Sequence, residues 1–333
     1  MPEDKPARRK RPTIADVAKR AGVAPAIVSR ALSPERRPVS REKRERVLKA
    51  AAELGYNQNP LARGLATNSL DMVAVIVNHI TDLSDLDLFD PLLEAIQALG
   101  KQAVIIRVGN TEKIEDFLRN SAAFHVHAAL VFSDFADAEG VRTLFHSDNV
   151  LMLNGRFDAK SAYITIDEAA GIREAVTRAL ERGAKTGALV TGRQTSLIEQ
   201  ARIQAYRDIC AGAGLDLVQE LQGDYSYASG LALAGRIDGA SLPDAIFCTS
   251  DAMAMGMMDG LRARDLLPPR DYRLYGFDAV VNANFNAFDI SSIGFDKAEL
   301  IHGISMFLKD PAGYRDHPEV HELRTRFVER STG

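Results

Sequence analysis

The sequence is poor in cysteine and has no long apolar run, and both absences narrow the class of protein. Its two cysteines, Cys210 and Cys248, form no CxxC pair, which argues against a disulfide framework and a structural zinc site. No stretch of about 18 apolar residues occurs. The basic start MPEDKPARRKRP is followed by no apolar segment. We therefore expect neither a membrane span nor a secretory signal, and we expect a cytoplasmic protein.

The sequence also lacks the glycine-rich and nucleophile motifs of common enzymes. It contains no GxGxxG, no GxxxxGK[ST] and no GxSxG, so we expect no enzyme activity and no cofactor. Two stretches, HVH at 125–127 and HPEVH at 317–321, offer histidines to a metal ion. The first falls at the edge of a predicted strand and the second contains a proline, so we expect no metal site.

Charge is unevenly distributed along the chain. Residues 1–69 contain sixteen lysines and arginines against seven aspartates and glutamates, a balance of +9, whereas the remaining residues carry −13. Phosphates attract a basic module and repel an acidic one. The pattern predicts that only the N-terminal part contacts nucleic acid.

Three short helices are predicted in this basic part. Thr13 can cap a helix over 14–20, with Ile14, Val17 and Ala18 on its apolar face. Gly22 suits the positive φ of a tight turn, and Pro25 suits the first position of a second helix. The predicted elements are a helix, a turn and a second helix, with the lengths that are typical of a DNA-binding helix-turn-helix motif.

The third helix is predicted from Ser40 to Leu54, ended by Gly55. Ser40 and Lys43 stand at the two positions of a capping box, although Lys43 replaces the usual glutamate. The inward positions are Val47, Leu48, Ala51 and Leu54.

The segments TIADVAKRAGV, IVSRALS and VSREKRERVLKAAAELGYNQNPLARGL resemble the DNA-binding head of the lactose and galactose repressor (LacI/GalR) family. The resemblance implies that the second helix lies in the major groove, where Arg30 reads a base edge. The alternative for Arg30 is a solvated surface charge. The DNA-contacting residues implied are Thr13, Pro25, Ala26, Ser29, Arg30, Arg44, Asn57 and Leu65.

Residues 59–66 (NPLARGLA) resemble the hinge helix of that family, which folds when two copies meet in the minor groove. In this resemblance Leu65 is the side chain that wedges between base pairs and kinks the duplex. The alternative is a linker leucine packed on its own domain.

The recognition helix departs from the family pattern at its start. Ala24, Pro25 and Ala26 stand where the family usually has a serine cap followed by polar residues. Hydrogen bonds to bases are lost there, while methyl contacts to thymine remain. We therefore expect a DNA site that is read mainly through Arg30 and through shape.

From residue 72 onward, apolar runs alternate with amphipathic helices, including helices near 89–99 and 113–120. Continuous apolar runs indicate parallel strands covered on both faces, with ligands bound beyond their carboxyl ends. The predicted strands are 73–77, 103–108, 128–132, 150–153, 163–166, 187–191, 245–250, 273–277 and 290–293.

The resemblance extends over this region. AIFCTSDAMAMGMMDGLRARDLLPPRDYRLYGFD is similar to the family's second subdomain, and LRTRFVERST to its C-terminal strand. It implies a periplasmic-binding-protein-like α/β body of two parallel-sheet subdomains behind an all-α helix-turn-helix head. The subdomain crossovers are expected near 167, 295 and 324. The expected domains are 1–57 for DNA binding, 58–70 for the hinge helix and linker, and 71–333 for effector binding and dimerisation.

By position, the resemblance implies an effector site in the cleft between the subdomains. Asp167 and Asp278 have the alternative of a hydrogen bond to a helix N-terminus, and Arg202 is expected to brace its helix. Ser250 and Glu168 stand where asparagine is usual, and ISS replaces LTT, so we name no effector; a sugar or sugar derivative is the family default. The implied effector residues are Asn78, Phe89, Arg156, Asp167, Ser196, Gln200, Tyr225, Ser250 and Asp278.

Together these features predict a nucleoid-associated transcriptional regulator, a repressor, that binds a pseudo-palindromic double-stranded operator and responds to a small-molecule effector. Two half-sites require a homodimer. The C-terminal end shows no leucine heptad that would suggest a tetramer, and a tetramer is left open as the alternative. The alternative is a periplasmic-type solute-binding protein without a DNA role. Such a protein would share the body, lack the basic head and carry a signal peptide.

Overall fold

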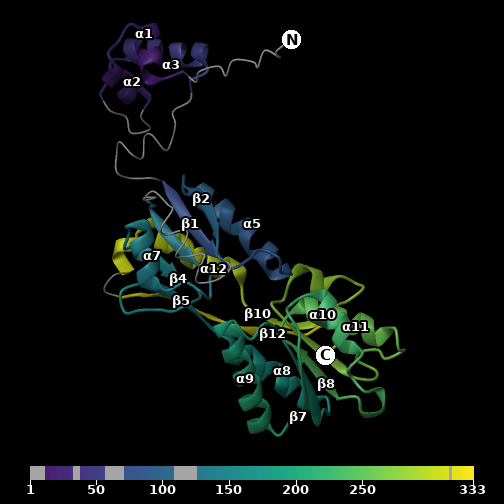
Figure 1. Ribbon diagram of the computed structural model, residues 1–333. Helices are drawn as coiled ribbons and strands as arrows, with labels where there is room; N and C mark the ends of the chain where they lie inside the picture. Colours follow the sequence, from purple (N-terminus) through teal and green to yellow (C-terminus); the bar gives the residue numbers. More distant parts are fainter. Residues whose placement is uncertain (1–11, 33–37, 57–70, 109–125, 315–316) are drawn as a thin grey trace, which may run out of the picture. The chain divides into compact units, whose positions relative to one another are not determined.

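The computed structural model describes residues 12–32, 38–56, 71–108, 126–314 and 317–333. The chain divides into two compact units, Met1–Leu70 and Asp71–Gly333, here called the head and the body. Figure 1 shows the elements of each unit. No helix in the described ranges combines the length and the apolar character needed to span a membrane.

The head contains three helices, α1 (Ile14–Ala21), α2 (Pro25–Leu32) and α3 (Arg41–Leu54). Thr13 caps α1 in a reciprocal capping box with Asp16, and Gly22 ends that helix at a φ of 64°. Small apolar side chains from all three helices, such as Val17, Val28 and Val47, form the head core.

Three details of the head predictions are wrong. Leu48 is 50% exposed, because Val47, Ala50 and Ala51 are the α3 residues that face the other helices. Ile14 is 36% exposed, because Val17, Ala18 and Ala21 are the buried residues of α1. Ser40 precedes α3 but makes no side-chain cap bond. Lys43 has only donors on its side chain, so it could not accept the reciprocal bond of a capping box.

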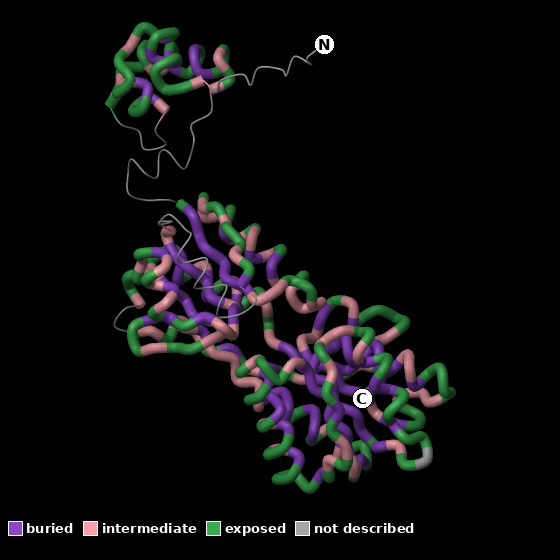
Figure 2. The backbone as a smooth tube through the Cα atoms, in the orientation of Figure 1, coloured by how far each residue is buried: buried purple, intermediate pink, exposed green. Residues whose placement is uncertain are grey.

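The body contains two six-stranded sheets, each with helices packed on both faces. Figure 2 shows buried strands in the interior of each sheet. The first sheet has the order β11-β5-β4-β3-β1-β2, and its paired strands are parallel. Its elements are β1 (Met72–Val77), α5 (Leu83–Ala98), β2 (Gln102–Arg107), β3 (Ala128–Val131), α7 (Ala138–Phe145), β4 (Val150–Met152), β5 (Ala162–Asp167), α12 (Lys297–Lys309) and β11 (Glu319–Arg324).

The second sheet has the order β12-β10-β9-β8-β6-β7, in which β12 pairs antiparallel with β10. Its elements are α8 (Glu168–Glu181), β6 (Thr186–Thr191), α9 (Leu197–Ala213), β7 (Asp216–Gln222), α10 (Tyr227–Ala234), β8 (Ala245–Cys248), α11 (Asp251–Arg262), β9 (Arg273–Phe277), β10 (Ser291–Gly294) and β12 (Arg326–Val328).

The chain passes between the sheets after β5, between β10 and α12, and between β11 and β12. The segment predicted as one C-terminal strand is therefore two strands in different sheets. Thr325 separates them, and its buried hydroxyl donates to the Asp167 carbonyl at 2.8 Å and accepts from the Gly171 amide at 2.9 Å. This hydroxyl joins two of the three connections between the subdomains.

The helix predicted near 89–99 begins earlier, at Leu83. Asp82 and Asp85 form a capping box there, with Asp85 accepting from the Asp82 amide at 3.0 Å. β7 was not predicted, because this edge strand has no continuous apolar run: every second residue is exposed, and among the described strands it pairs with β6 alone. The helix predicted near 113–120 lies outside the described residues.

Candidate nucleic-acid interface and ligand cleft

Helix α2 exposes the face predicted to read DNA. Pro25, Ala26, Ser29 and Arg30 are all exposed, while Val28 and Ala31 on the opposite face are buried. The Arg30 Nε donates to the Ala26 carbonyl at 3.1 Å, which lays the side chain along the helix surface. Its terminal nitrogens provide the two-pronged donor that a guanine edge accepts.

The other predicted DNA contacts are placed differently. Thr13 uses its side chain in the cap of α1, where it meets Asp16. Arg44 is half-buried, and its Nη1 donates to the Ala31 carbonyl at 2.8 Å, so it joins α3 to the C-terminal end of α2. Asn57 and Leu65 lie outside the described residues.

A cleft of about 460 Å³ lies between the two body subdomains, beyond the carboxyl ends of strands from both sheets. Residues from loops after β1, β3, β6, β7, β8 and β9 line it. Of the predicted effector residues, the cleft brings together Asn78, Phe89, Ser196, Tyr225, Ser250 and Asp278.

Three predicted effector residues do not line the cleft. Asp167 caps α8 by accepting from the Ala170 amide at 3.2 Å, which is the structural alternative for this residue. Gln200 is exposed on α9 and donates to the Gln194 carbonyl at 2.7 Å. Arg156 is exposed, with its backbone bridged to Asp137.

The first-subdomain wall is organised around Asp134, which sequence reasoning missed. Asn78 donates to Asp134 Oδ2 at 2.8 Å and accepts from the Ser133 hydroxyl at 2.6 Å. Burial raises the pKa of Asp134, and hydrogen bonds from Ser196 and Asn78 partly offset this. Its position three residues beyond a buried strand, β3, was the signal that could have identified it.

The second-subdomain wall holds Asp278, whose backbone φ is 95°. A non-glycine residue in this region is strained, and such strain persists where the surrounding structure imposes it. Burial raises the pKa of Asp278 to about 6. Arg202, expected to brace its helix, does so in part: it donates to Glu168 at 2.9 and 2.5 Å and stacks 3.7 Å from the Phe277 ring centroid.

A second acid, Asp251, is fully buried behind the cleft. Burial and the neighbouring Asp278 raise the pKa of Asp251 to about 8. Ser292, in the unusual ISS segment, donates to Asp251 Oδ1 at 2.6 Å, and the Val280 amide donates to Oδ2 at 2.8 Å. The two aspartates therefore form a coupled pair.

Tyr225 adds an aromatic surface to the cleft. Its φ is 71°, and its ring packs against Gly192, where an added Cβ would lie 1.9 Å from a ring carbon. The Arg193 guanidinium lies 5.2 Å from the ring centroid. Gly192 is thus required for this placement of the ring.

Side chains also cross the cleft. Arg193, in the loop after β6, reaches Asp82 Oδ2 at 3.2 Å and His79 Nε2 at 2.6 Å. The Ser196 hydroxyl donates to Asp134 at 3.3 Å. Asp87 of α5 accepts from the Val281 amide at 2.9 Å and from Lys297 at 3.1 Å. The subdomains are held together by polar contacts on both sides of the cleft.

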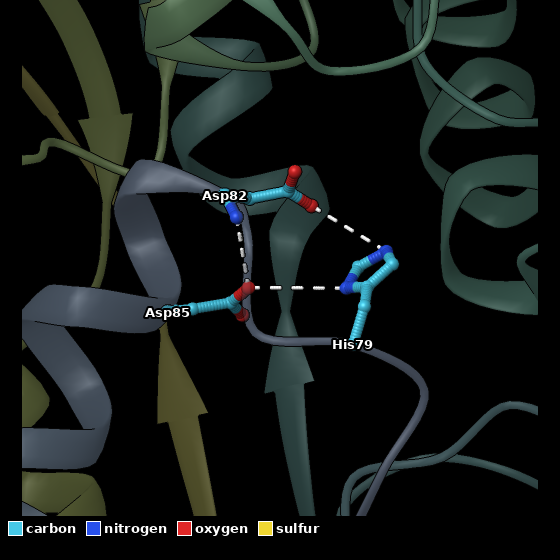
Figure 3. Close-up of side chains that lie close together, drawn as sticks. All are labelled: His79, Asp82 and Asp85. Atoms are coloured by element: carbon cyan, nitrogen blue, oxygen red, sulfur yellow. Dashed lines mark hydrogen bonds and ion pairs between the residues drawn. The ribbon is translucent and has the colours of Figure 1, made fainter. Parts of the chain in front are cut away.

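His79, Asp82 and Asp85 are close enough to consider as metal ligands. Figure 3 shows the imidazole facing both carboxylates, with its two nitrogens 3.7 and 3.8 Å from an oxygen of Asp82 and of Asp85. Arg193 donates to both His79 Nε2 and Asp82, so its guanidinium already occupies the position of a cation. The arrangement is that of an ion-pair network.

Comparison with known proteins gives matches over both units. Residues 13–59 match the model of bacterial regulatory proteins of the lacI family, and residues 176–332 match that of a periplasmic binding protein-like domain. The catabolite control protein A of Priestia megaterium is 30% identical over 276 residues, covering 80% of this chain and 82% of that protein. The transcriptional repressor PurR of Vibrio parahaemolyticus is 27% identical, covering 96% and 98%.

Solved structures share the fold. The lac repressor dimer bound to operator and the anti-inducer ONPF gives a TM-score of 0.84 at 21% identity, covering 97% of this chain and 99% of that one. The complex of the regulator CelR with cellobiose gives a TM-score of 0.67 at 25% identity, covering 97% and 100%.

Proposed function

Because this chain belongs to the LacI family, it is a DNA-binding transcriptional regulator with an effector-binding domain, and we propose which of its residues perform each task. Arg30 reads a guanine edge in the major groove, Pro25 and Ala26 present apolar contacts to thymine, and Ser29 binds phosphate. The exposure of this face of α2 supports the assignment. Arg44 and Thr13 position the helices that carry these contacts, with Asn57 and Leu65 assigned as phosphate and minor-groove contacts.

The protein acts as a dimer on a pseudo-palindromic operator. One head contacts few DNA phosphates. A two-fold symmetric site is read by two heads that lie one helical turn or more apart along the DNA. Residues 1–57 bind DNA, 58–70 connect the units, and 71–333 bind the effector and the second copy. We place the protein in the cytoplasm, at the nucleoid, where its DNA lies.

The effector binds in the cleft, and one observation carries this proposal. Hydrogen-bonding side chains that follow strands of both sheets converge on a single cavity of about 460 Å³. A ligand that contacts Asn78 and Ser196 on opposite walls changes the relative free energy of open and closed cleft conformations. A differential affinity worth about 1–3 kcal/mol is enough to switch operator occupancy. The cleft binds its ligand without transforming it.

The test is selection of bound sites from random duplex DNA by the full-length protein, followed by titration of metabolites against the selected duplex. We expect a pseudo-palindrome whose central base step matters for the wild type and not for Leu65→Ala. We also expect at least one metabolite to raise or lower operator affinity. Selection of no consensus sequence, with and without metabolites, would contradict the proposal.

A further inference from the structure

The cleft carries more acidic than basic side chains. Four aspartates line it, at positions 82, 85, 134 and 278, together with three arginines, at positions 107, 193 and 202. The net charge available to a ligand in the cleft depends on which of these side chains are already paired with other residues of the protein.

Two of the three arginines, Arg193 and Arg202, are paired with acids of the protein. Arg202 binds Glu168 through two nitrogens and donates a third bond to the Thr249 carbonyl at 3.0 Å. Arg193 binds Asp82 and His79 across the cleft. Arg107 is exposed, and its Nε donates to the Asn78 carbonyl at 3.3 Å.

Two of the aspartates are also committed. Asp82 pairs with Arg193, and Asp85 accepts the backbone amides of Thr81 and Asp82 at 2.9 and 3.0 Å. Asp134 accepts hydrogen bonds only from the neutral groups of Asn78 and Ser196.

Asp278 has the least compensation of the four. Its carboxylate accepts no hydrogen bond from the residues that the structure describes, and two cations act on it from a distance, Arg202 and Lys297. Each of those cations is paired with another acid, Glu168 and Asp87 respectively. Glu168 and Glu199 act on it as negative charges from the same side.

The carboxylate of Asp278 therefore has no directly paired cation among the residues that the structure describes. Low-dielectric surroundings penalise its charged form, which explains why burial raises the pKa of both Asp134 and Asp278. The same cleft is lined by Phe89 and Phe132, whose rings pack edge to face with centroids 5.4 Å apart. Aromatic faces attract cations through their quadrupoles.

We propose that the effector is a small molecule bearing a protonated amine, which pairs with Asp278 in the cleft. This inference rests on the proposed effector role of the cleft. It goes further by assigning the charge of the ligand and the residue that selects it. Asn78, Ser196 and Ser250 supply hydrogen bonds to the remaining polar groups of the ligand.

The ion pair predicts a coupling between ligand binding and protons. The groups around Asp278 are Asp251, Glu168, Glu199, Arg202 and Lys297. Near pH 6 a fraction of Asp278 is protonated in the free protein, and an ammonium group favours its charged form. Amine binding should therefore release protons and strengthen as pH rises from 5 to 7.

The experiment uses the full-length protein and pairs of compounds that differ only in an amine or a hydroxyl. Suitable probes are glucosamine with glucose, galactosamine with galactose, and 4-aminobutanol with 1,4-butanediol. Calorimetry in two buffers of different ionisation enthalpy measures affinity and proton release together. We expect at least one amine to bind about tenfold or more tighter than its hydroxyl partner.

The variants assign this preference to a residue. Asp278→Asn keeps the shape of the side chain and should reduce the preference for the amine at least about tenfold. Asp134→Asn gives a second test on the opposite wall and should leave most of the preference. Asp208→Asn, on the exposed face of α9, is the matched control and should change nothing.

The outcomes separate this inference from the proposed function. If hydroxyl compounds bind as well as amines, or if the preference survives in Asp278→Asn, the inference fails while the cleft remains an effector site. If no amine in the set binds, the inference also fails. A neutral or anionic metabolite that binds the cleft and changes operator affinity would keep the proposed function and overturn the amine.

Discussion

Arg193 and Asp82 come from opposite subdomains, and their side chains meet across the cleft at 3.2 Å. The guanidinium also lies 5.2 Å from the centroid of the Tyr225 ring, and its Nη1 donates to His79 Nε2 at 2.6 Å. Because a guanidinium can only donate, this contact requires an unprotonated Nε2. The pair links a loop of one sheet to the N-terminus of α5 on the other, so it favours the closed cleft.

Replacing Arg193 by glutamine should open the cleft with little loss of global stability. The pair is partly exposed, and such pairs contribute about 0–1 kcal/mol. Spin labels at Glu139→Cys and Gln204→Cys, one on each subdomain, would report the change as a longer and broader distance distribution. The native thiols should stay unlabelled, since both are buried and burial raises the pKa of Cys210 to about 12.

The control is Arg207→Gln, which breaks an exposed pair with Glu220 inside one subdomain. Its distance distribution should match that of the parent protein. An unchanged distribution for Arg193→Gln would show that the pair does not hold the cleft.

Arg30→Ala should weaken binding to the selected operator by about 1–3 kcal/mol and relax the preference at one base position of each half-site. The side chain is exposed, so the head should fold as before. Fluorescence anisotropy on the selected duplex and on single-base variants measures both effects. Arg41→Ala, which removes an exposed pair with Glu45, serves as the control and should weaken all duplexes alike, if at all.

Removing the side chain that precedes α1 and the one that precedes α3 should affect the stability of the head differently. Thr13→Ala should reduce the stability of the head by about 1 kcal/mol, because it removes a side-chain cap and its capping box. Ser40→Ala should leave stability unchanged, because Ser40 makes no cap bond. Hydrogen exchange of the amides in α1 and α3 of the full chain distinguishes the two variants. Equal effects would contradict the assignment of the caps.

Asp278→Asn should stabilise the body at pH 8 by about 1–3 kcal/mol and have little effect at pH 4. The folded-state pKa of Asp278 is raised, to about 6, so folding favours the protonated acid. The stability that this raised pKa contributes is present below the unfolded pKa and is lost as pH rises through the folded pKa. Urea unfolding of the body at several pH values measures the change, and a variant less stable at pH 8 would contradict it.

Gly192→Ala should displace the Tyr225 ring, because the added Cβ would lie 1.9 Å from a ring carbon. Overpacking of this kind costs about 1–3 kcal/mol, and we expect weaker binding of any cleft ligand. Gly212→Ala is the matched control: it lies within α9, nothing approaches its added Cβ within 4 Å, and it should stabilise the helix slightly. Equal ligand affinity in both variants would show that the Tyr225 ring is not part of the site.

The fold was predictable for strands in which nearly every residue is buried, because such strands are continuous apolar runs in the sequence. Strands such as β1 and β8 are buried along their length and stand out as apolar runs. β7 was missed because an edge strand exposes alternate residues, which removes that signal. Leu48 was assigned inward because periodicity alone does not decide between neighbouring positions on a helix that packs through valine and alanine.

The site was predictable to the extent that it follows strand ends. Asn78 and Asp278 lie directly after β1 and β9, and Ser250 lies two residues after β8, so topology brings them together. Asp167 also follows a strand, yet it lies at a crossover, where its carboxylate caps α8. Pairs across the cleft, such as Arg193 with Asp82, depend on how two separate sheets face each other, and local sequence carries no record of that.

The Thr325 hydroxyl connects two crossing strands of chain at one point, and Gly171 beside it has no room for a Cβ, which would lie 2.8 Å from that oxygen. Because two of the three connections are hydrogen-bonded to each other here, we expect the subdomains to rotate relative to each other rather than to separate. Thr325 should then lie at the hinge of that rotation. A ligand that moves the walls slightly near the hinge will move the distant ends of both sheets through a larger arc.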